Sequence, residues 1–353
     1  MFIIKVAIAM GRKVFVLSLL VLALLIVSAY HLSTGAYDIS VVDVLKSTIG
    51  LNDDPSISLI ANLRLRRLAS ALLAGFALGV AGATMQSALR NPLASPFTLG
   101  ISQAAALGVA VALLVFELGG RVERAFIAVE SPYLLALAAL TSAFVQLAIV
   151  LSLAYVAGLT ERALILAAIS MSFFYGALVN LIQYLKFNEI RVAMLTFWLF
   201  GDVGRPAWQE LYFISVPTLI AVIYLIIRSL RLDLDLLSMG DEIAASSGVD
   251  PRRARLELAL VATIAAALVT AFMGVLAFIC LLAPHIARLL VGHSYRFVVL
   301  TASITGALLV VLADAVGRSI ISPATLPVGV VGSLLGAPLL IALLLGREVF
   351  RRE

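Results

Sequence analysis

Few side chains in this sequence could carry out chemistry, and they are scattered along the chain. The three histidines, His31, His285 and His293, lie near the ends of different apolar segments, with no carboxylate or thiol at metal-ligand spacing. The one cysteine, Cys280, cannot form an internal disulfide. The patterns H-E-x-x-H and G-x-S-x-G are both absent. We therefore predict neither a metal site nor a catalytic site, and we expect His285 to serve a structural hydrogen bond.

The sequence also lacks a phosphate-binding loop. No segment reads G-x-x-x-x-G-K-[ST], and the sole Lys-Ser pair, Lys46-Ser47, has no glycine before it. If the chain moves a solute, the energy must come from another polypeptide or from an ion gradient. No Asp, Glu or Lys lies near the middle of a predicted span, although ion pathways normally need such a group. This disfavours gradient-driven transport without excluding a sodium site built from backbone carbonyls.

The elements that must position these residues are apolar helices. Of the 353 residues, 63% are hydrophobic and 13% are charged, and the mean hydropathy is +1.12. A soluble chain carries about 25% charged residues, so this chain cannot cover a water-facing surface. Continuous apolar runs, without alternation, predict an all-α polytopic membrane protein in one domain, residues 1–353, and exclude a β-barrel. Ten spans are expected, at 14–32, 66–88, 98–117, 132–157, 163–186, 208–229, 253–273, 274–291, 297–318 and 326–346.

The basic residues predict an orientation. With both termini in the cytoplasm, the inner loops and tails hold 15 of the 25 Lys and Arg residues, as expected for a cell-membrane protein. The excess of basic residues therefore indicates a lipid bilayer as the partner and not a nucleic acid. The main exception is Arg64, Arg66 and Arg67 in "LRLRRL", which this topology places outside. These arginines either reach lipid headgroups or have a function on the outer face. Arg318 could form an i,i+4 pair with Asp314.

Two polar segments interrupt the inner side. In "RNPLASPFTLG", residues 90–100, Pro92 and Pro96 stop helix propagation. Irregular backbone at membrane depth is tolerated where it is buried in protein or lines a water-filled path. The loop is therefore either part of such a path or a plain turn in which Asn91 caps the next helix.

The second polar segment, about 231–252, is the longest inner piece. It predicts a short helix from Asp241, with acids in its first turn, that stops near Gly248. The following helix is expected to begin at Asp250-Pro251, an N-cap followed by proline. From spacing alone, this segment is equally a surface for a partner or a solvated connector.

Glycines at helical spacing predict close packing between helices, because small residues let helices approach each other in lipid. They are Gly75, Gly79, Gly82, Gly332 and Gly336.

Long ordered motifs resemble a known family. "LRLRRLASALLAGFALGVAGATMQSALRNPLASPFTLGIS", "GDEIAASSGV" and "GVLAFICLLAPHIARLLVG" are similar to the signatures of permease subunits of ABC importers for iron-siderophore, haem and cobalamin, the FecCD type. The last two predicted spans match as well, so the likeness covers nearly all of the chain after the first helix. It departs at Cys280, where the family usually has Gly, at Arg66, where Pro is usual, and at Glu161, where a small polar residue is usual.

The resemblance implies a homodimer of ten-helix subunits around a translocation path, without catalysis or a bound cofactor in this chain. Two cytoplasmic ATPase subunits would use ATP and Mg, and an extracytoplasmic substrate-binding protein would deliver the cargo. The cargo would be a ferric siderophore, haem or cobalamin, or an oxyanion such as molybdate; an ion-gradient-driven transporter is the other alternative.

The resemblance also implies roles for particular residues. The cytoplasmic gate would comprise Asn91, Pro92, Leu93, Thr160 and Glu161. The ATPase-coupling segment would include Gly240, Asp241, Glu242, Ala244, Ala245 and Gly248. Arg64, Arg67 and Arg318 would meet acidic residues of the binding protein, because guanidinium groups bind carboxylates bidentately.

Overall fold

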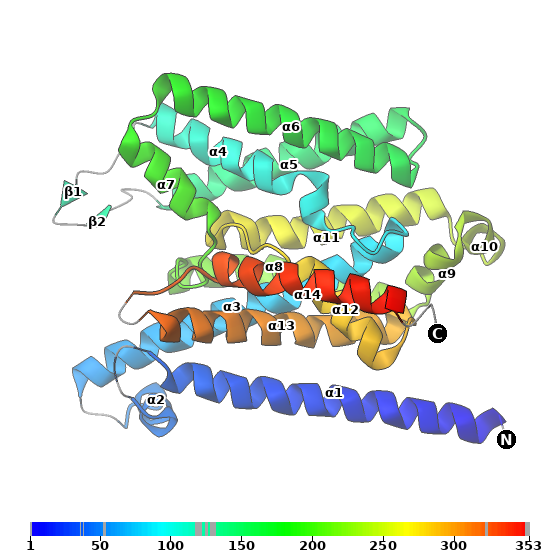
Figure 1. The fold of residues 1–353 in the computed structure, drawn as a ribbon, viewed down its shortest axis with the longest axis horizontal. Coiled ribbons are helices and arrows are strands. Elements are labelled where there is room, and N and C mark those ends of the chain that lie inside the picture. The colour runs from blue at the N-terminus through cyan, green and yellow to red at the C-terminus, as the bar shows by residue number, and fades with distance from the viewer. Residues whose placement is uncertain are drawn as a thin grey trace.

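The computed structural model describes residues 2–35, 37, 39–51, 54–116, 122–123, 126–127, 132–321 and 324–349. Long helices lie roughly along one axis and form a bundle (Figure 1). One end of the bundle carries the start of α1 (Phe2–Ser33) and two short helices, α9 (Asp233–Met239) and α10 (Asp241–Ser246). The other end carries α2 (Val41–Thr48). We refer to them as the α10 end and the α2 end.

Ten of the described helices overlap the predicted spans. Among the described residues, seven are long and apolar enough to cross a membrane: α1, α3 (Pro55–Ala88), α5 (Pro132–Val156), α6 (Glu161–Lys186), α8 (Trp208–Leu230), α11 (Pro251–Met273) and α13 (Tyr295–Ile320). Three shorter apolar helices coincide with the other predicted spans: α4 (Ile101–Val115), α12 (Ile279–Val291) and the first part of α14 (Val328–Val349). The helical membrane-protein class is confirmed, while ten crossings stay a prediction.

The start of the second predicted span was wrong. Helix α3 begins at Pro55, not at 66, because the Asp54 side chain caps it by accepting a hydrogen bond from the Ser56 amide at 2.8 Å. The helix then runs unbroken for 34 residues. Arg64 and Arg67 consequently lie well inside a continuous helix and not at its first turn.

Several short elements were not predicted. Helix α7 (Glu189–Leu199) lies between α6 and α8, and a 3-10 turn, η1 (Pro96–Leu99), precedes α4. A two-residue antiparallel pair joins β1 (Val122–Glu123) to β2 (Phe126–Ile127). Helix α2 begins with a capping box between Ser40 and Asp43. The hydrogen bonds from the Ser40 hydroxyl and amide lower the pKa of the Asp43 carboxyl below its ordinary value.

Helices α3 and α13 pack backbone to backbone at the centre of the bundle. A Cβ added at Gly75 or Gly79 would lie less than 3.0 Å from the backbone of α13, and one at Gly82 would lie as close to the backbone of Cys280 in α12. Only glycine permits this approach. Gly336 meets the Phe278 side chain closely.

Gly332 differs from the other glycines that we predicted to pack closely. A Cβ there would make an ordinary contact, 3.5 Å from the carbonyl oxygen of Ala277. The neighbouring backbone is simply farther away, so close approach does not require glycine at this position.

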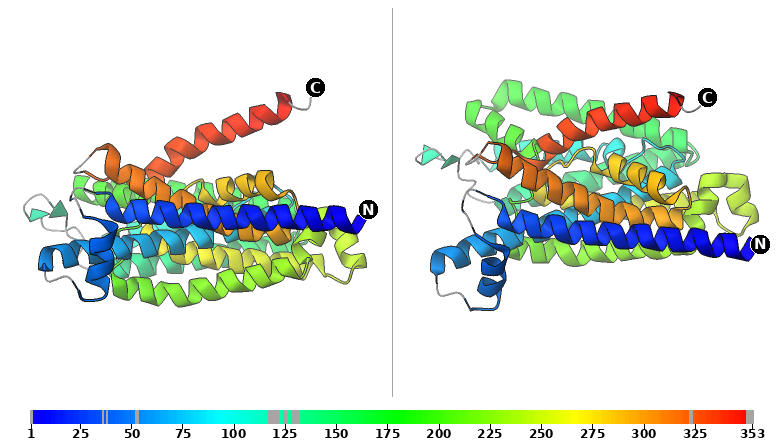
Figure 2. Two further views of the ribbon diagram at one scale, coloured as in Figure 1. Left: turned by 90° about the horizontal axis from the view of Figure 1, so that it is seen from below. Right: turned by 60° about the horizontal axis from the view of Figure 1, so that its bottom comes forward.

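The remaining helices surround this centre. Helices α4, α5 and α6 contact one another and form one side of the bundle, and α1 lies on the opposite side (Figure 1). Helix α14 leans away from the other helices toward its C-terminal end (Figure 2). The loop after α3 and the loop before α6 are both near the α10 end, where α9 and α10 project beyond the bundle.

Candidate functional site

The loop between α3 and η1, residues 89–95, breaks the helix by local hydrogen bonding. Arg90 adopts the left-handed conformation, with φ of 43°. This turns the chain so that the Asn91 amide donates back to the carbonyl of Gln86 at 3.2 Å. This local hydrogen bond fixes the direction in which the loop leaves α3.

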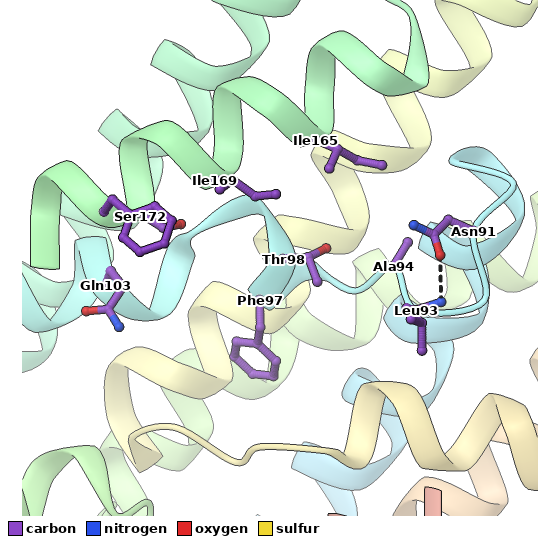
Figure 3. A pocket seen from close by; sticks show the side chains of 10 residues that line it. Asn91, Leu93, Ala94, Phe97, Thr98, Gln103, Ile165, Ile169 and Ser172 are labelled. Carbon is purple, nitrogen blue, oxygen red and sulfur yellow. Dashed lines mark hydrogen bonds between the residues drawn. The ribbon is translucent and has the colours of Figure 1, made fainter. Parts of the chain in front are cut away.

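A tight turn then forms around the proline. The Ala94 amide donates to the Asn91 carbonyl at 3.0 Å, which places Pro92 and Leu93 in the two central positions. The Asn91 side-chain oxygen also accepts from the Leu93 amide at 2.9 Å (Figure 3). Asn91 therefore closes this turn, and Ser95 caps the next helical element. Leu93 is left 58% exposed at the tip.

A cavity of about 490 Å³ lies beside this loop, between η1, α4 and α6. Figure 3 shows side chains of the loop on one side and of α6 on the other. Most of the lining is apolar, with a few uncharged polar groups. The lining residues are Asn91, Leu93, Ala94, Phe97, Thr98, Gln103, Ile165, Ile169, Ser172 and Phe173.

The loop before α6 is also set by local geometry. Gly158 and Leu159 both have positive φ, 84° and 54°, which reverses the chain. The Thr160 hydroxyl caps α6 by accepting from the amide three residues later, at 3.2 Å. Glu161, the first residue of α6, pairs with Arg90 of the other loop. An ion pair thus joins the two predicted gate segments within one chain.

The predicted coupling segment forms two short helices and not one. Gly240, with φ of 132°, separates α9 from α10, and α10 begins at Asp241 as predicted. The Asp241 carboxylate lies 2.7 Å from Arg255 of α11 and 3.8 Å from Arg90. Ala244 is fully buried. The exposed members of the predicted set are Glu242, Ala245 and Gly248.

At the α2 end, Asp314 of α13 is the centre of a buried polar cluster. Its two carboxylate oxygens accept from the Arg67 Nε at 2.8 and 2.9 Å. The same carboxylate contacts the His31 Nε2 at 2.7 Å and the Arg318 Nε at 3.2 Å. Arg67 also binds Asp202 at 2.7 Å. The Asp314 carboxylate therefore joins α13 to α1 and α3, and Arg67 adds the loop after α7 through Asp202.

Arg64 and Arg318 hydrogen-bond to the C-terminal end of α1, next to this cluster. Arg64 donates to the carbonyls of Leu32 at 2.7 Å and Ser33 at 3.0 Å. Arg318 donates to the carbonyls of Thr34 at 2.7 Å and His31 at 2.8 Å. Arg64 is 5% exposed and Arg318 is 8% exposed. Their guanidinium groups bond within the chain, and the i,i+4 pair of Arg318 with Asp314 is present. Docking of a binding protein by these arginines stays a prediction.

With this geometry described, comparison with known proteins identifies the family. The model of the FecCD transport family matches residues 20–346. The chain belongs to this family. A Methanocaldococcus jannaschii protein named as an ABC transporter permease is 38% identical to this FecCD chain over 95% of each sequence. The Fe(3+)-citrate import system permease YfmE of Bacillus subtilis is 32% identical, over 94% of this chain and 95% of its own.

A solved structure of an ABC transporter has the same fold as this chain. An ABC transporter described as of metal-chelate type, in an inward-facing conformation, has a TM-score of 0.79 and 28% identity. The match covers 94% of this chain and 99% of that one. The protein is accordingly an ABC transporter permease of a transport family, with several helices long and apolar enough to span a membrane.

Sequence reasoning missed four residues of the FecCD chain that connect distant elements. His31 was considered only as a metal ligand, and no partner was predicted for Arg90, Asp202 or Arg255. Their partners lie between 14 and 283 residues away along the chain. Among the described residues, no group of three His, Cys, Asp or Glu side chains could hold a metal ion.

Proposed function

We propose that this FecCD chain is the membrane-spanning subunit of an ABC importer for a metal chelate. Two copies would form the translocation path, and two separate ATPase subunits would supply the energy. An extracytoplasmic binding protein would deliver the cargo. The observation that carries this proposal is the family match over residues 20–346, combined with a projecting α10 whose first acid contacts the segments beside the cavity.

The α10 end is proposed to face the cytoplasm. It holds the start of α1 and the two short helices, in keeping with the excess of basic residues expected on the inner side. Glu242 and Ala245 are exposed on α10, so an ATPase could bind this helix without a rearrangement of the other helices. The negative first turn of α10 would suit a basic surface on that ATPase.

The second copy is proposed to close the cavity beside the 89–95 loop. In one chain the cavity is open, and Phe173 at its rim is 77% exposed, with Leu93 also protruding. An apolar rim of this kind needs either lipid or protein against it. A second chain across a two-fold axis would place two copies of Leu93 and of Asn91 near one another, where they could obstruct the path.

Binding-protein docking is proposed for the α2 end, on the surface that the Asp314 cluster holds together. Arg64, Arg67 and Arg318 would act there by fixing the end of α1, not by direct contact. Complementary charges at such a surface would govern orientation and association rate more than affinity.

The cargo class is inferred from the relatives and from the lining. Uncharged polar groups among apolar side chains make weak contacts, which suits release of a large chelate. Ferric citrate is the cargo named for the Bacillus subtilis relative. A permease for an oxyanion such as molybdate is the alternative within the same class.

The proposal is tested in vesicles that contain the chain with its ATPase, the binding protein outside and Mg-ATP inside. Accumulation of ferric citrate, a ferric hydroxamate, hemin, cobalamin and molybdate is measured separately. Accumulation of one of the metal chelates supports the proposal. Accumulation of molybdate alone establishes the oxyanion alternative, and no accumulation of any cargo by a complex that hydrolyses ATP contradicts the proposal.

A further inference from the structure

Arg255 occupies an unusual place near the start of α11. Its side chain is 2% exposed and is among the largest fully buried side chains of the part of the chain that the structure describes. Its neighbours Arg252 and Arg253 are exposed, as expected for the first turn of a helix at a membrane surface. A guanidinium is always charged, so its burial is unfavourable unless hydrogen bonds and an opposite charge compensate.

Three segments provide that compensation. The Arg255 Nε donates to the carbonyl of Ala88, the last residue of α3, at 3.0 Å. One terminal nitrogen donates to the carbonyl of Leu159, in the loop before α6, at 3.1 Å. The other donates to the carboxylate of Asp241, the first residue of α10, at 2.7 Å. Each of the three nitrogens of one planar group therefore holds a different segment.

These three segments are the parts of the chain that the proposed function requires to move together. Ala88 immediately precedes the 89–95 loop, and Leu159 immediately precedes Thr160 and Glu161. Asp241 opens the helix that we propose the ATPase grips. We infer that Arg255 is the positioning residue that transmits the position of α10 to both gate loops. This inference rests on the proposed function and names a link within it.

The chemistry of the side chain favours transmission over simple anchoring. The guanidinium is rigid and planar, so its three bonds keep fixed relative directions. A displacement of Asp241 must then rotate or draw the whole group, or break a charged hydrogen bond. The two carbonyls lie where α3 ends and where the chain reverses, and such carbonyls have no intrahelical partner. Arg255 is thus a preferred donor for both.

A second, weaker link runs parallel to the first. Arg90 pairs with Glu161 and lies 3.8 Å from Asp241, so Asp241 faces both arginines. The Arg90 side chain is 33% exposed, and water screens exposed pairs strongly. Arg255 is buried and should therefore carry most of the coupling.

The test follows the two ends of the link separately in the assembled complex of the chain with its ATPase. A nitroxide is attached to a cysteine at Leu93 or, in a second sample, at Ile243 of α10, both exposed in the single chain. The native Cys280 is fully buried and does not compete for the label. Spectra are compared without nucleotide and with Mg-ATP and vanadate.

In the otherwise wild-type chain both labels should respond to nucleotide. With Arg255→Gln, the label at Ile243 should respond as before. The nucleotide-dependent shift of the conformational equilibrium reported by the Leu93 label should fall at least about tenfold, because the charged hydrogen bond to Asp241 is lost together with the guanidinium bonds to the two carbonyls. The ATPase should still co-purify. Arg253→Gln is the matched control, since Arg253 is exposed and pairs with Asp250 of its own helix turn; both labels should respond there.

A full response of the Leu93 label in Arg255→Gln would overturn the inference. Loss of ATPase binding in that variant would also overturn it, because Arg255 would then serve only the shape of the docking helix. If Arg255→Gln does not fold, Asp241→Asn provides the same test, since it leaves both carbonyl bonds of Arg255 in place and should uncouple the Leu93 label. If neither label responds to nucleotide in the otherwise wild-type complex, the result contradicts the proposed function itself, and not only the role inferred for Arg255.

Discussion

Neutralising Asp314 should destabilise the whole chain. Asp314→Asn preserves the shape of the side chain but removes the one carboxylate that pairs with Arg318 among the described residues, while Arg67 keeps Asp202. One buried guanidinium would therefore lose its counter-charge, and breaking a buried ion pair in this way costs about 3–5 kcal/mol. For a chain of this length, that loss corresponds to a fall in the unfolding midpoint of roughly 4–7 °C.

Thermal unfolding of the purified chain in detergent measures this effect. Glu189→Gln is the matched control, because it removes one carboxylate charge from the exposed start of α7. The control should change the midpoint by roughly 2 °C or less. Equal midpoints for Asp314→Asn and the control would refute the reasoning that this carboxylate balances a buried charge cluster.

Three further changes test separate parts of the account. Gly79→Val should lower the unfolding midpoint by several degrees, because its Cβ would clash with the Ala302 carbonyl. Gly332→Ala should leave the midpoint unchanged, because its Cβ would make only an ordinary contact. Equal effects of the two variants would contradict the packing of α3 on α13. Glu242→Lys should reduce co-purification of the ATPase without moving the midpoint, since this side chain is exposed; unchanged assembly would remove α10 from the interface. Arg64→Ala should speed backbone hydrogen exchange in residues 30–35, because it removes the hydrogen bonds that hold the end of α1. If exchange is unaltered but binding-protein docking is weakened, Arg64 has a direct docking role instead.

The features that the sequence predicted correctly are those with local causes. Helix α10 begins at Asp241, with acids in its first turn, and ends shortly before Gly248; Pro92 follows the end of α3 because it cannot continue a helix. The apolar runs likewise indicate each long helix. Local signals also existed for the true start of α3, Asp54 followed by Pro55, but the polar residues after them obscured a helix that continues outside the apolar run.

The features that the sequence did not predict depend on distant partners. Arg255 and Ala88 are 167 residues apart, and Arg67 and Asp314 are 247 apart. Nothing near Arg255 in "DPRRARLE" distinguishes a buried arginine from an exposed one. The intrachain partners of the outer arginines are mostly distant too: Arg67 binds Asp314 of α13, and Arg64 and Arg318 donate to backbone carbonyls at the end of α1.

The most direct test of the central claim concerns the source of energy. The purified chain is reconstituted alone in vesicles, with a sodium or proton gradient, and in parallel with its ATPase, its binding protein and Mg-ATP but no gradient. We expect accumulation of the metal chelate against its concentration gradient only in the vesicles that hold the ATPase and ATP. Uphill accumulation by the chain alone on an ion gradient would contradict the account.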